Sequence, residues 1–337
     1  MIAVSVVIPC RNEKKYIGKC ITSVLQSDFP YGEFEILVCD GKSDDGTADI
    51  IRGLSAQHPN VIYVENREQV TPYALNYGAK KARGEVVIIL GAHAEVDKNY
   101  LKLCYEFLRD EKELGCVGGL LDNVFEDEIS EAIAGAMSSR FGVGNAHFRT
   151  GTAEGYVDTV AFGAYKREVF EKVGYFDEEL VRNQDDEFNY RVTKAGYRIR
   201  LSKDIRAKYY VRAGFRKLFR QYYQYGYWKV YVNKKHKAVT TMRQLVPPAF
   251  VAFLIGGALL SALLPFAWMI YAGLLALYLL GSFVSAIPVA KNPAGYFRTV
   301  ISFWILHVSY GAGYLEGIFH FIVLGRKPSG GRQASSR

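Results

Sequence analysis

The chain has 337 residues, of which 50% are hydrophobic, and a formal net charge of +8. This length exceeds a typical single domain, and the hydrophobic share suits a globular protein that carries a membrane segment. The five cysteines form no CxxC pair, which argues against a zinc site or a disulfide framework and predicts reduced core thiols. No basic segment precedes the first apolar run, so we expect no secretory signal and a cytoplasmic N-terminal part.

Residues 4–47 are the most informative part of the chain. An apolar run breaks at Pro9, a charged turn follows at 11–13, and a second apolar run ends at Asp40 before a Gly/Ser/Asp loop. This order predicts strand, loop, helix, strand and loop. Since ligands of open α/β sheets bind at the carboxyl ends of the strands, we expect Asp40 and Glu13 to flank one nucleotide pocket. The absence of GxGxxG and of a P-loop argues against a dinucleotide-binding domain.

Further apolar runs at 61–64 and 86–90 predict two more strands, with a helix over 71–84 between them. Later strands are expected at 117–119 and 157–164, and later helices at 169–175 and 186–195. The interval 122–154 is rich in Gly, Ser and Ala and has no clean period. We interpret it as a mobile loop. The family resemblance described below implies that this loop would contact the acceptor substrate.

The positive charge is concentrated between residues 198 and 243, which hold 14 Lys/Arg and a single acid. Within this stretch, aromatic residues recur at helical intervals among the basic ones. Such a helix suits the headgroup layer of a membrane, whereas aromatic and basic alternation also suits single-stranded nucleic acid. The apolar segments that follow favour lipid, so we expect no nucleic-acid partner.

Residues 244–290 contain no charged side chain, which leaves room for two spanning helices at about 246–264 and 268–288. A third apolar segment, 299–325, contains His307, Glu316 and His320. Because ionisable groups are costly in a bilayer, it is either a span packed on the first two or a broken re-entrant segment. The positive-inside rule favours a cytoplasmic tail, but the topology of the third segment stays open.

Three motifs resemble family 2 glycosyltransferases: the opening segment 4–47, the acidic sequence RNQDDEFNYR at 182–191, and QYGYW at 224–228. The segment VDTVAFGAYKREVFEKVGYFDEEL resembles, more closely, succinoglycan-biosynthesis-type membrane glucosyltransferases. The resemblance implies an α/β fold of the GT-A type, which is a Rossmann-like mixed sheet of nucleotide-diphospho-sugar transferases. An interfacial amphipathic helix and two to three C-terminal transmembrane helices would follow it. The implied domains are 1–211 (catalytic), 212–243 (interfacial helix), 244–325 (transmembrane) and 326–337 (basic disordered tail).

The same resemblance implies roles for the acidic cluster and the fourth-strand turn. Asp185 would be the general base, with Glu187 orienting it and Asp186 as the competing candidate; a structural helix cap is the alternative. The family's Asp-x-Asp reads Gly-Ala-His here, so His93 is left to hold Mn²⁺ or Mg²⁺, with Glu95 as the alternative source of charge. A capping or core histidine is the competing interpretation.

The implied binding residues fall into two groups. The nucleotide-sugar would contact Pro9, Arg11, Asn12, Glu13, Asp40, Lys42, Ser43, Asp45, Asn76, Gly78, Lys81 and Ala92. The acceptor would contact Gln184, Arg191, Gln224, Tyr227 and Trp228, where Tyr227 replaces the arginine of the family's Gln-x-x-Arg-Trp motif.

The sequence therefore predicts a metal-dependent, membrane-anchored, inverting hexosyltransferase of a bacterial or archaeal plasma membrane, with its catalytic domain in the cytoplasm. It would move a hexose from a UDP-sugar, or less readily a GDP-sugar, to a polyprenyl-linked saccharide, in contact with membrane lipid and compatible with an oligomer. One alternative is transfer to polyprenyl phosphate itself, as in dolichyl-phosphate mannose synthases. Another is a degenerate, non-catalytic nucleotide-sugar-binding protein, suggested by Gly91.

Overall fold

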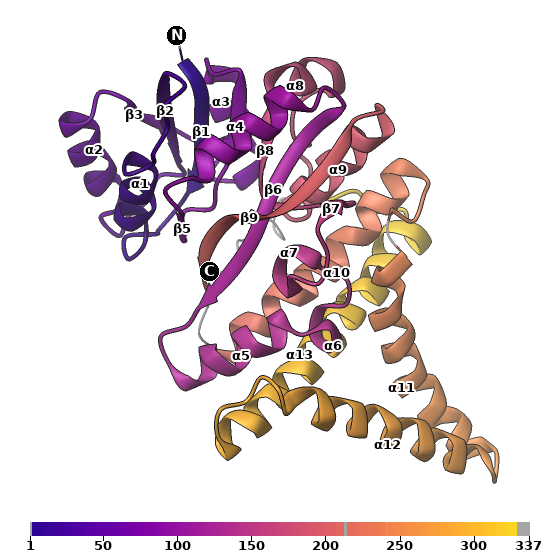
Figure 1. Ribbon diagram of the computed structural model, residues 1–337. Coiled ribbons are helices and arrows are strands. Elements are labelled where there is room, and N and C mark those ends of the chain that lie inside the picture. The colour runs from indigo at the N-terminus through magenta and orange to yellow at the C-terminus, as the bar shows by residue number, and fades with distance from the viewer. Residues whose placement is uncertain (1, 212–213, 241, 329–337) are drawn as a thin grey trace. The chain divides into compact units, whose positions relative to one another are not determined.

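The computed structural model describes residues 2–211, 214–240 and 242–328, and most of the predicted basic tail 326–337 lies outside these ranges. The chain forms two compact units (Figure 1). The first comprises residues 1–122 and 147–210, and the second comprises 123–146 and 211–337. The predicted mixed α/β domain followed by C-terminal helices is confirmed.

The first unit is built on a sheet whose described strands are ordered β3-β2-β1-β4-β8-β6-β9-β5, with β7 paired to β9. Strands β1 to β4 run parallel, and β8 is antiparallel to both β4 and β6. The strands are β1 Ile2–Cys10, β2 Glu33–Asp40, β3 Val61–Glu65, β4 Val86–Ile89, β5 Ala94–Val96, β6 Leu114–Val124, β7 Gly155–Tyr156, β8 Ala161–Lys166 and β9 Arg198–Tyr210. The carboxyl ends of β1, β2 and β4 therefore lie at one edge of the sheet.

Helices alternate with the strands, and the sequence pattern did not predict α4 or α7. They are α1 Ile17–Leu25, α2 Thr47–Gln57, α3 Thr71–Lys81, α4 Tyr100–Asp110, α7 His147–Thr150, α8 Arg167–Val173 and α9 Gln184–Lys194. Helix α8 ends at Gly174, whose φ of +82° is accessible to glycine without strain. The predicted helices at 169–175 and 186–195 are thus present, each starting two residues earlier.

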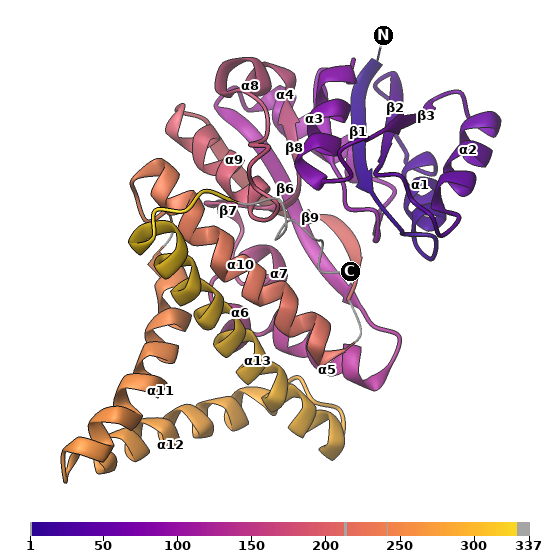
Figure 2. The ribbon, with the colours of Figure 1, turned by 180° about the vertical axis from the view of Figure 1, so that it is seen from behind.

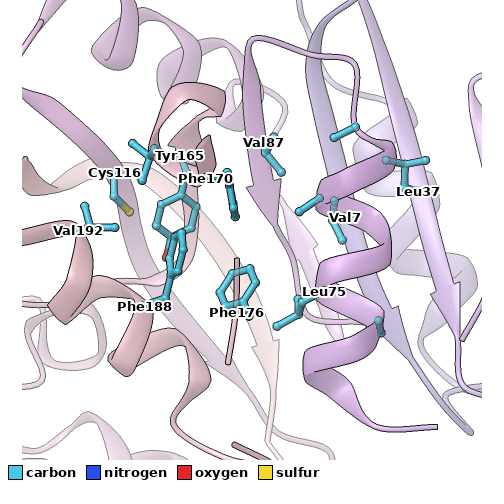
Figure 3. Close-up of a cluster of buried hydrophobic side chains, with 14 of the residues drawn as sticks. Val7, Leu37, Leu75, Val87, Cys116, Tyr165, Phe170, Phe176, Phe188 and Val192 are labelled. Carbon is cyan, nitrogen blue, oxygen red and sulfur yellow. The ribbon is translucent and has the colours of Figure 1, made fainter. Parts of the chain in front are cut away.

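An aromatic cluster joins α3, α8 and α9 to one face of the sheet (Figure 3). The ring of Phe188 on α9 lies 4.6 Å from that of Phe176, 5.0 Å from Phe170 and 5.1 Å from Tyr165, measured between centroids. Leu75 of α3 joins the same cluster. Burying such rings is strongly favourable, so the start of α9 is fixed against the sheet by Phe188.

The second unit consists of helices. They are α5 Glu128–Ser138, α6 Arg140–Val143, α10 Phe215–His236, the 3₁₀ turn Met242–Leu245, α11 Val246–Leu263, α12 Ala267–Ala286, α13 Pro293–Gly317 and a π-helical turn Ile318–Val323. Helices α10 and α13 run side by side in both views (Figures 1 and 2). Their backbones approach at glycines, since a Cβ on Gly226 would stand 2.0 Å from the Tyr310 carbonyl oxygen and one on Gly313 would stand 2.1 Å from that of Tyr223.

The predicted interfacial helix is therefore not a simple surface helix. The central residues 226–232 of α10 are all buried, whereas its ends carry exposed basic side chains. Lys229 in this central part is only 3% exposed. The central aromatic residues of α10 therefore pack against neighbouring helices, and its exposed basic residues lie at its two ends.

The interpretation of residues 122–154 as a mobile loop is wrong in its structural part, because helices α5, α6 and α7 occupy most of the interval. Helix α5 begins with a capping box in which the Asp127 carboxylate accepts from the Ser130 N–H at 2.7 Å. Lys291 pairs with Glu131 at 2.7 Å, and Arg298 pairs with Glu128. Alanine and serine in this stretch are helix and packing residues, which composition alone did not distinguish from a loop.

Among the described residues, two helices are long and apolar enough to cross a membrane, namely Met242–Leu263 and Ala267–Ala286, and only 11% of each apolar window is buried. They meet at a short connection near residue 265 and then diverge (Figure 2). The third predicted segment forms α13 and the π-turn, and α13 contacts both α10 and α11. Its buried face includes Thr299, Ser302 and Ser309, in contrast to the two exposed apolar helices.

Candidate active site

The loops that follow β1 and β2 are tied to each other by side chains. The Asn12 N–H donates to Ser43 Oγ at 2.8 Å, and the Asp44 N–H donates to Asn12 Oδ1 at 3.1 Å. Asn12 and Lys42 have positive φ values of 54° and 53°, so both loops turn sharply. The two loops therefore form one continuous wall at the carboxyl edge of the sheet.

Asp40 is the buried centre of this wall, with no exposed surface. Its carboxylate accepts from the N–H and hydroxyl of Ser43 and, at 3.2 Å, from the Tyr63 hydroxyl. Partial burial, and then the negative charge of Asp40, raise the pKa of the Tyr63 phenol, so it remains a donor. Asp40 is thus held in one orientation where β2 ends.

Asp45 and Thr47 extend the network to the first loop. Asp45 accepts from the Thr47 N–H at 3.0 Å and from the Lys14 N–H at 3.1 Å, while Thr47 Oγ1 accepts from the Glu13 N–H at 2.9 Å. Burial alone raises the pKa of the Asp45 carboxyl, but the hydrogen bonds from Thr47 and Lys14 outweigh it and keep that pKa below its ordinary value. The position of Glu13 is consequently fixed by the second loop.

The remaining predicted nucleotide residues differ in their surroundings. Arg11 reaches the Gln69 carbonyl at 3.5 Å, and Pro9 lies at the end of β1. The Asn76 amide joins the Phe176 backbone, donating at 2.9 Å and accepting at 2.9 Å, and a Cβ on Gly78 would stand 2.2 Å from Val7. Asn76 and Gly78 thus contribute to packing in this structure. Lys81 is exposed at the end of α3, and Ala92 is buried within the turn that follows β4.

The turn after β4 contains Gly91, Ala92 and His93. A Cβ on Gly91 would stand 2.8 Å from the Phe162 ring, and Phe162 itself has a φ of 51°, which is rare for an aromatic residue. His93 Nδ1 lies 3.7 Å from Glu13 Oε1. The structure therefore places His93 beside Glu13, while the Glu95 carboxylate accepts from the Tyr210 hydroxyl.

The acidic cluster lies in the first turn of α9. Glu187 is buried and pairs with Arg191, whose Nε is 2.8 Å from Glu187 Oε1. Arg191 also donates to the carbonyls of Val173 and Tyr175. This pair therefore fastens α9 to the turn after α8, which is a structural use of two residues predicted for the catalytic and acceptor sites.

Asn189 provides a second anchor for α9. Its side chain accepts from the Tyr165 hydroxyl at 2.8 Å and donates to Thr159 Oγ1 at 2.9 Å. Glu187, Phe188 and Asn189 are buried, whereas Gln184 and Asp186 are half-buried. Asp185 is exposed, and its Oδ1 accepts from the Asp186 N–H at 2.9 Å.

The three residues predicted from the QYGYW motif lie on α10 in the second unit. The Tyr227 hydroxyl is 3.2 Å from His320 Nδ1 of the π-turn, and the Trp228 ring is buried near Phe321. Gln224 is half-buried. Within its own unit the motif thus contributes to the packing of α10 on the π-turn.

Sequence reasoning missed four residues that shape this edge of the sheet: Phe162, Thr47, Tyr63 and Asn189. Thr47 follows an Asp-Asp-Gly turn and begins a helix, which is a recognisable signal for a capping and loop-tying residue. Nothing in the sequence pairs Phe162 with Gly91, since they are separated by seventy residues and meet only because β8 lies beside β4.

Chemically, the arrangement combines a buried acceptor, a histidine–carboxylate pair and an exposed carboxylate at a helix start. Asp40 holds the loop after β2 in place, and the His93–Glu13 pair suits a divalent cation. No group of three or more His, Cys, Asp or Glu suited to a metal occurs among the residues that the structure describes. Any cation would need ligands from a bound molecule.

Comparisons with known proteins place this site in context. Residues 5–174 match the family model described as "Glycosyl transferase family 2". The chain is 34% identical over 230 residues to dolichyl N-acetyl-alpha-D-glucosaminyl phosphate 3-beta-D-2,3-diacetamido-2,3-dideoxy-beta-D-glucuronosyltransferase of Methanococcus voltae, covering 66% of this chain and 71% of that protein. It is 30% identical over 322 residues to succinoglycan biosynthesis protein ExoA of Rhizobium meliloti, covering 94% and 95%.

A solved structure has a similar fold. The mannosyltransferase PcManGT from Pyrobaculum calidifontis, in complex with GDP-Man and Mn²⁺, matches with a TM-score of 0.62, 20% identity, and coverage of 94% of this chain and 87% of that one. At this level of identity the likeness concerns the fold alone.

Proposed function

The chain belongs to glycosyltransferase family 2 and is a glycosyltransferase of glycan or polysaccharide biosynthesis, and from that premise we propose a specific reaction. The enzyme moves a hexose from a UDP-sugar, or less readily a GDP-sugar, to a polyprenyl-linked saccharide, with inversion at the anomeric carbon. The observation that carries this proposal is the position of Asp185, which is exposed at the start of a helix that Phe188 and the Glu187–Arg191 pair hold in place.

The donor is held by the wall of loops after β1 and β2. Asp40, which is itself buried, holds the loop after β2 in position beside the base, and the part of this loop formed by Lys42, Ser43 and Asp45 encloses the ribose. The diphosphate lies toward the β4 turn, where His93 would hold Mn²⁺ or Mg²⁺. When bound, the cation neutralises charge on the departing diphosphate.

Asp185 accepts the proton of the acceptor hydroxyl as general base. The acceptor oxygen then forms a bond to the anomeric carbon from the face opposite the diphosphate, the bond from that carbon to the diphosphate oxygen breaks, and UDP leaves with the electron pair. One such in-line displacement inverts the configuration. Asp185 lies in the first turn of α9, where the helix dipole favours a negative charge.

A lipid-linked acceptor and a membrane anchor fit the second unit. Helices α11 and α12 expose large apolar side chains, among them Leu263 at 76% and Ile270 at 68% exposure, and such surfaces are stable in hydrocarbon rather than in water. The M. voltae relative is named for a dolichyl-phosphate-linked sugar. We therefore place the reaction at a membrane surface, with the catalytic unit in the cytoplasm.

The test is UDP release from a panel of UDP-sugars and GDP-sugars by the detergent-solubilised full chain, with and without a polyprenyl lipid extract. We expect lipid-dependent release from one donor. Asp185→Asn should lower turnover about 10²- to 10⁴-fold, as loss of a general base does, while leaving the melting temperature and UDP affinity near those of the wild type.

The control is Asp177→Asn, an acidic residue in the same unit that lies outside the proposed site. Near-normal turnover of Asp185→Asn would contradict the proposal and favour polyprenyl phosphate as acceptor, because an ionised phosphate needs no base. Absence of UDP release from every donor, with intact UDP binding, would instead favour a degenerate binding protein.

A further inference from the structure

The side chains of Glu13 and His93 meet although they come from different loops. Glu13 follows β1 and His93 follows β4, and these strands are adjacent and parallel. His93 Nδ1 and Glu13 Oε1 are 3.7 Å apart, and the side chains are 18% and 13% exposed. This separation is too long for a hydrogen bond. It is close to the spacing of two neighbouring ligands around one cation, roughly 3.0–3.5 Å when each bond is about 2.1 Å.

The backbones of both residues are fixed. The Glu13 N–H donates to Thr47 Oγ1, and the Glu13 carbonyl accepts from Tyr16 and Ile17 at 2.9 Å. The His93 carbonyl accepts from the Tyr210 N–H at 3.1 Å, and the His93 ring lies edge-on to Tyr209 at 5.1 Å. The pair is therefore pre-arranged, as a metal site requires.

The other carboxylates near the β4 turn are less suitable. Glu95 lies on β5 with its carboxylate bonded to Tyr210, and Phe162 fills the space that a side chain at Gly91 would need. A carboxylate at position 91 would thus require Phe162 to move. Glu13 is the carboxylate that the described structure brings to His93.

Extending the cation role in the proposed function, we infer that Glu13 and His93 together form the protein half of a Mn²⁺ site that is completed by the diphosphate. Mn²⁺ takes more than two ligands, and the described residues offer no group of three. The cation therefore binds weakly to the protein alone and tightly with a nucleoside diphosphate. By linkage, Mn²⁺ tightens UDP binding by the same factor.

The chemical type of the two ligands, one imidazole and one carboxylate, also determines which metal ion is preferred. An imidazole nitrogen binds the softer Mn²⁺ better than Mg²⁺, whereas a second carboxylate would favour the hard cation. We therefore expect Mn²⁺ to be preferred over Mg²⁺. In His93→Asp, the ratio of Mn²⁺ affinity to Mg²⁺ affinity should be smaller than in the wild type.

The experiment measures free Mn²⁺ by electron paramagnetic resonance in solutions of the detergent-solubilised full chain, without nucleotide, with UDP, and with UDP and competing Mg²⁺. Protein-free samples with the same UDP correct for Mn²⁺ bound by the nucleotide. We expect Mn²⁺ affinity to rise about tenfold or more with UDP. Glu13→Gln and His93→Ala should each weaken it about 10- to 100-fold or more, while Glu95→Gln retains it.

Retention of Mn²⁺ binding by folded Glu13→Gln, or its loss in Glu95→Gln, would overturn the inference; circular dichroism and the melting temperature report folding. If Glu13→Gln does not fold, the ratio of Mn²⁺ to Mg²⁺ affinity in His93→Asp provides the test. A ratio equal to that of the wild type would overturn the inference. Equal Mn²⁺ affinity with and without UDP would also overturn it. UDP-dependent Mn²⁺ binding without transfer to a polyprenyl-linked acceptor would support the metal site and contradict the proposed reaction. Transfer that EDTA does not reduce would support the reaction and contradict the metal site.

Discussion

Strand β2 carries a buried carboxylate near each end, and the two carboxylates accept hydrogen bonds from different parts of the fold. Glu35, near its start, accepts from the Ser5 hydroxyl, from the Arg83 N–H and from the Arg83 guanidinium. Asp40, at its end, accepts from Ser43 of its own loop and from Tyr63. Glu35 is 1% exposed and Asp40 has no exposed surface.

The difference lies in where the donors come from. The donors to Glu35 belong to β1 and to the end of α3, so the amino edge of the sheet is closed by an ion pair. The donors to Asp40 are Ser43, in the loop after β2, and Tyr63, on the neighbouring strand β3. Both lie near the carboxyl edge, where parallel strands leave room for a ligand. Glu35 therefore ties β2 to β1 and to Arg83, whereas Asp40 holds the loop after β2 at the edge where ligands of such sheets bind.

The largest expected effect concerns Asp40. Asp40→Asn removes the charged acceptor that holds Ser43 and Tyr63. Because the loop after β2 then loses its position, UDP binding should weaken by about 1.5–3 kcal/mol, or roughly 10- to 100-fold. Isothermal titration with UDP measures it, and Asp44→Asn, an exposed neighbour, is the matched control. Equal losses in both variants would show that the loop's overall charge, rather than Asp40, binds the nucleotide.

The converse variant is Glu35→Gln. It should lower the free energy of unfolding by about 1–3 kcal/mol, because the buried donors around Glu35 lose part of their acceptor, yet leave UDP affinity unchanged. Urea denaturation and titration together test this, with the exposed Glu33→Gln as control. A weaker UDP complex in Glu35→Gln would break the separation between the two edges.

A smaller effect is expected from Thr47→Val, which keeps the shape of the side chain but removes the oxygen that accepts from Glu13. UDP binding in the presence of Mn²⁺ should weaken by about 1 kcal/mol, or about fivefold. Thr22→Val, on the exposed side of α1, is the control. An unchanged affinity would mean that Glu13 does not depend on the second loop.

The smallest effect is the pH dependence of the Glu35 site. Burial alone raises the pKa of this carboxyl, but hydrogen bonds from Arg83 and Ser5 outweigh it, so its folded pKa lies below the unfolded value of about 4.3. Its stabilisation is therefore present above that value and is lost as pH falls through the folded pKa. The stability gap between wild type and Glu35→Gln should shrink from pH 7 to pH 3, and a constant gap would contradict the assignment.

Much of the carboxyl edge could be predicted because its residues adjoin strand ends in the sequence. Asp40, Asp45 and Glu13 are recognisable from the strand–loop pattern alone, and the structure does bring their loops together. The His93–Glu13 contact was not predictable in this way. Strand order decides it, since β4 lies beside β1 on the side opposite β2 and β3.

Other predictions failed or stayed open for a similar reason. Residues 123–146 lack a clear hydrophobic period because helix α5 is covered on more than one side, and its acidic residues pair with Lys291 and Arg298. Likewise, the aromatic residues of α10 suggested a surface helix, whereas glycines on α10 and α13 allow the two backbones to approach closely. Periodicity reveals one buried face, but not a second one created by a distant helix.

The sequence by itself determined the α/β alternation, the acidic residues at the strand ends and the two uncharged helices, since each follows from local pattern and chain order. Tertiary structure decided which side chains share a task. Glu187 forms an ion pair with Arg191, Asp185 is exposed, and the Phe162 ring packs beside Gly91. These pairings depend on strand order and ring packing between residues far apart in the chain, and local propensity carries no information about them.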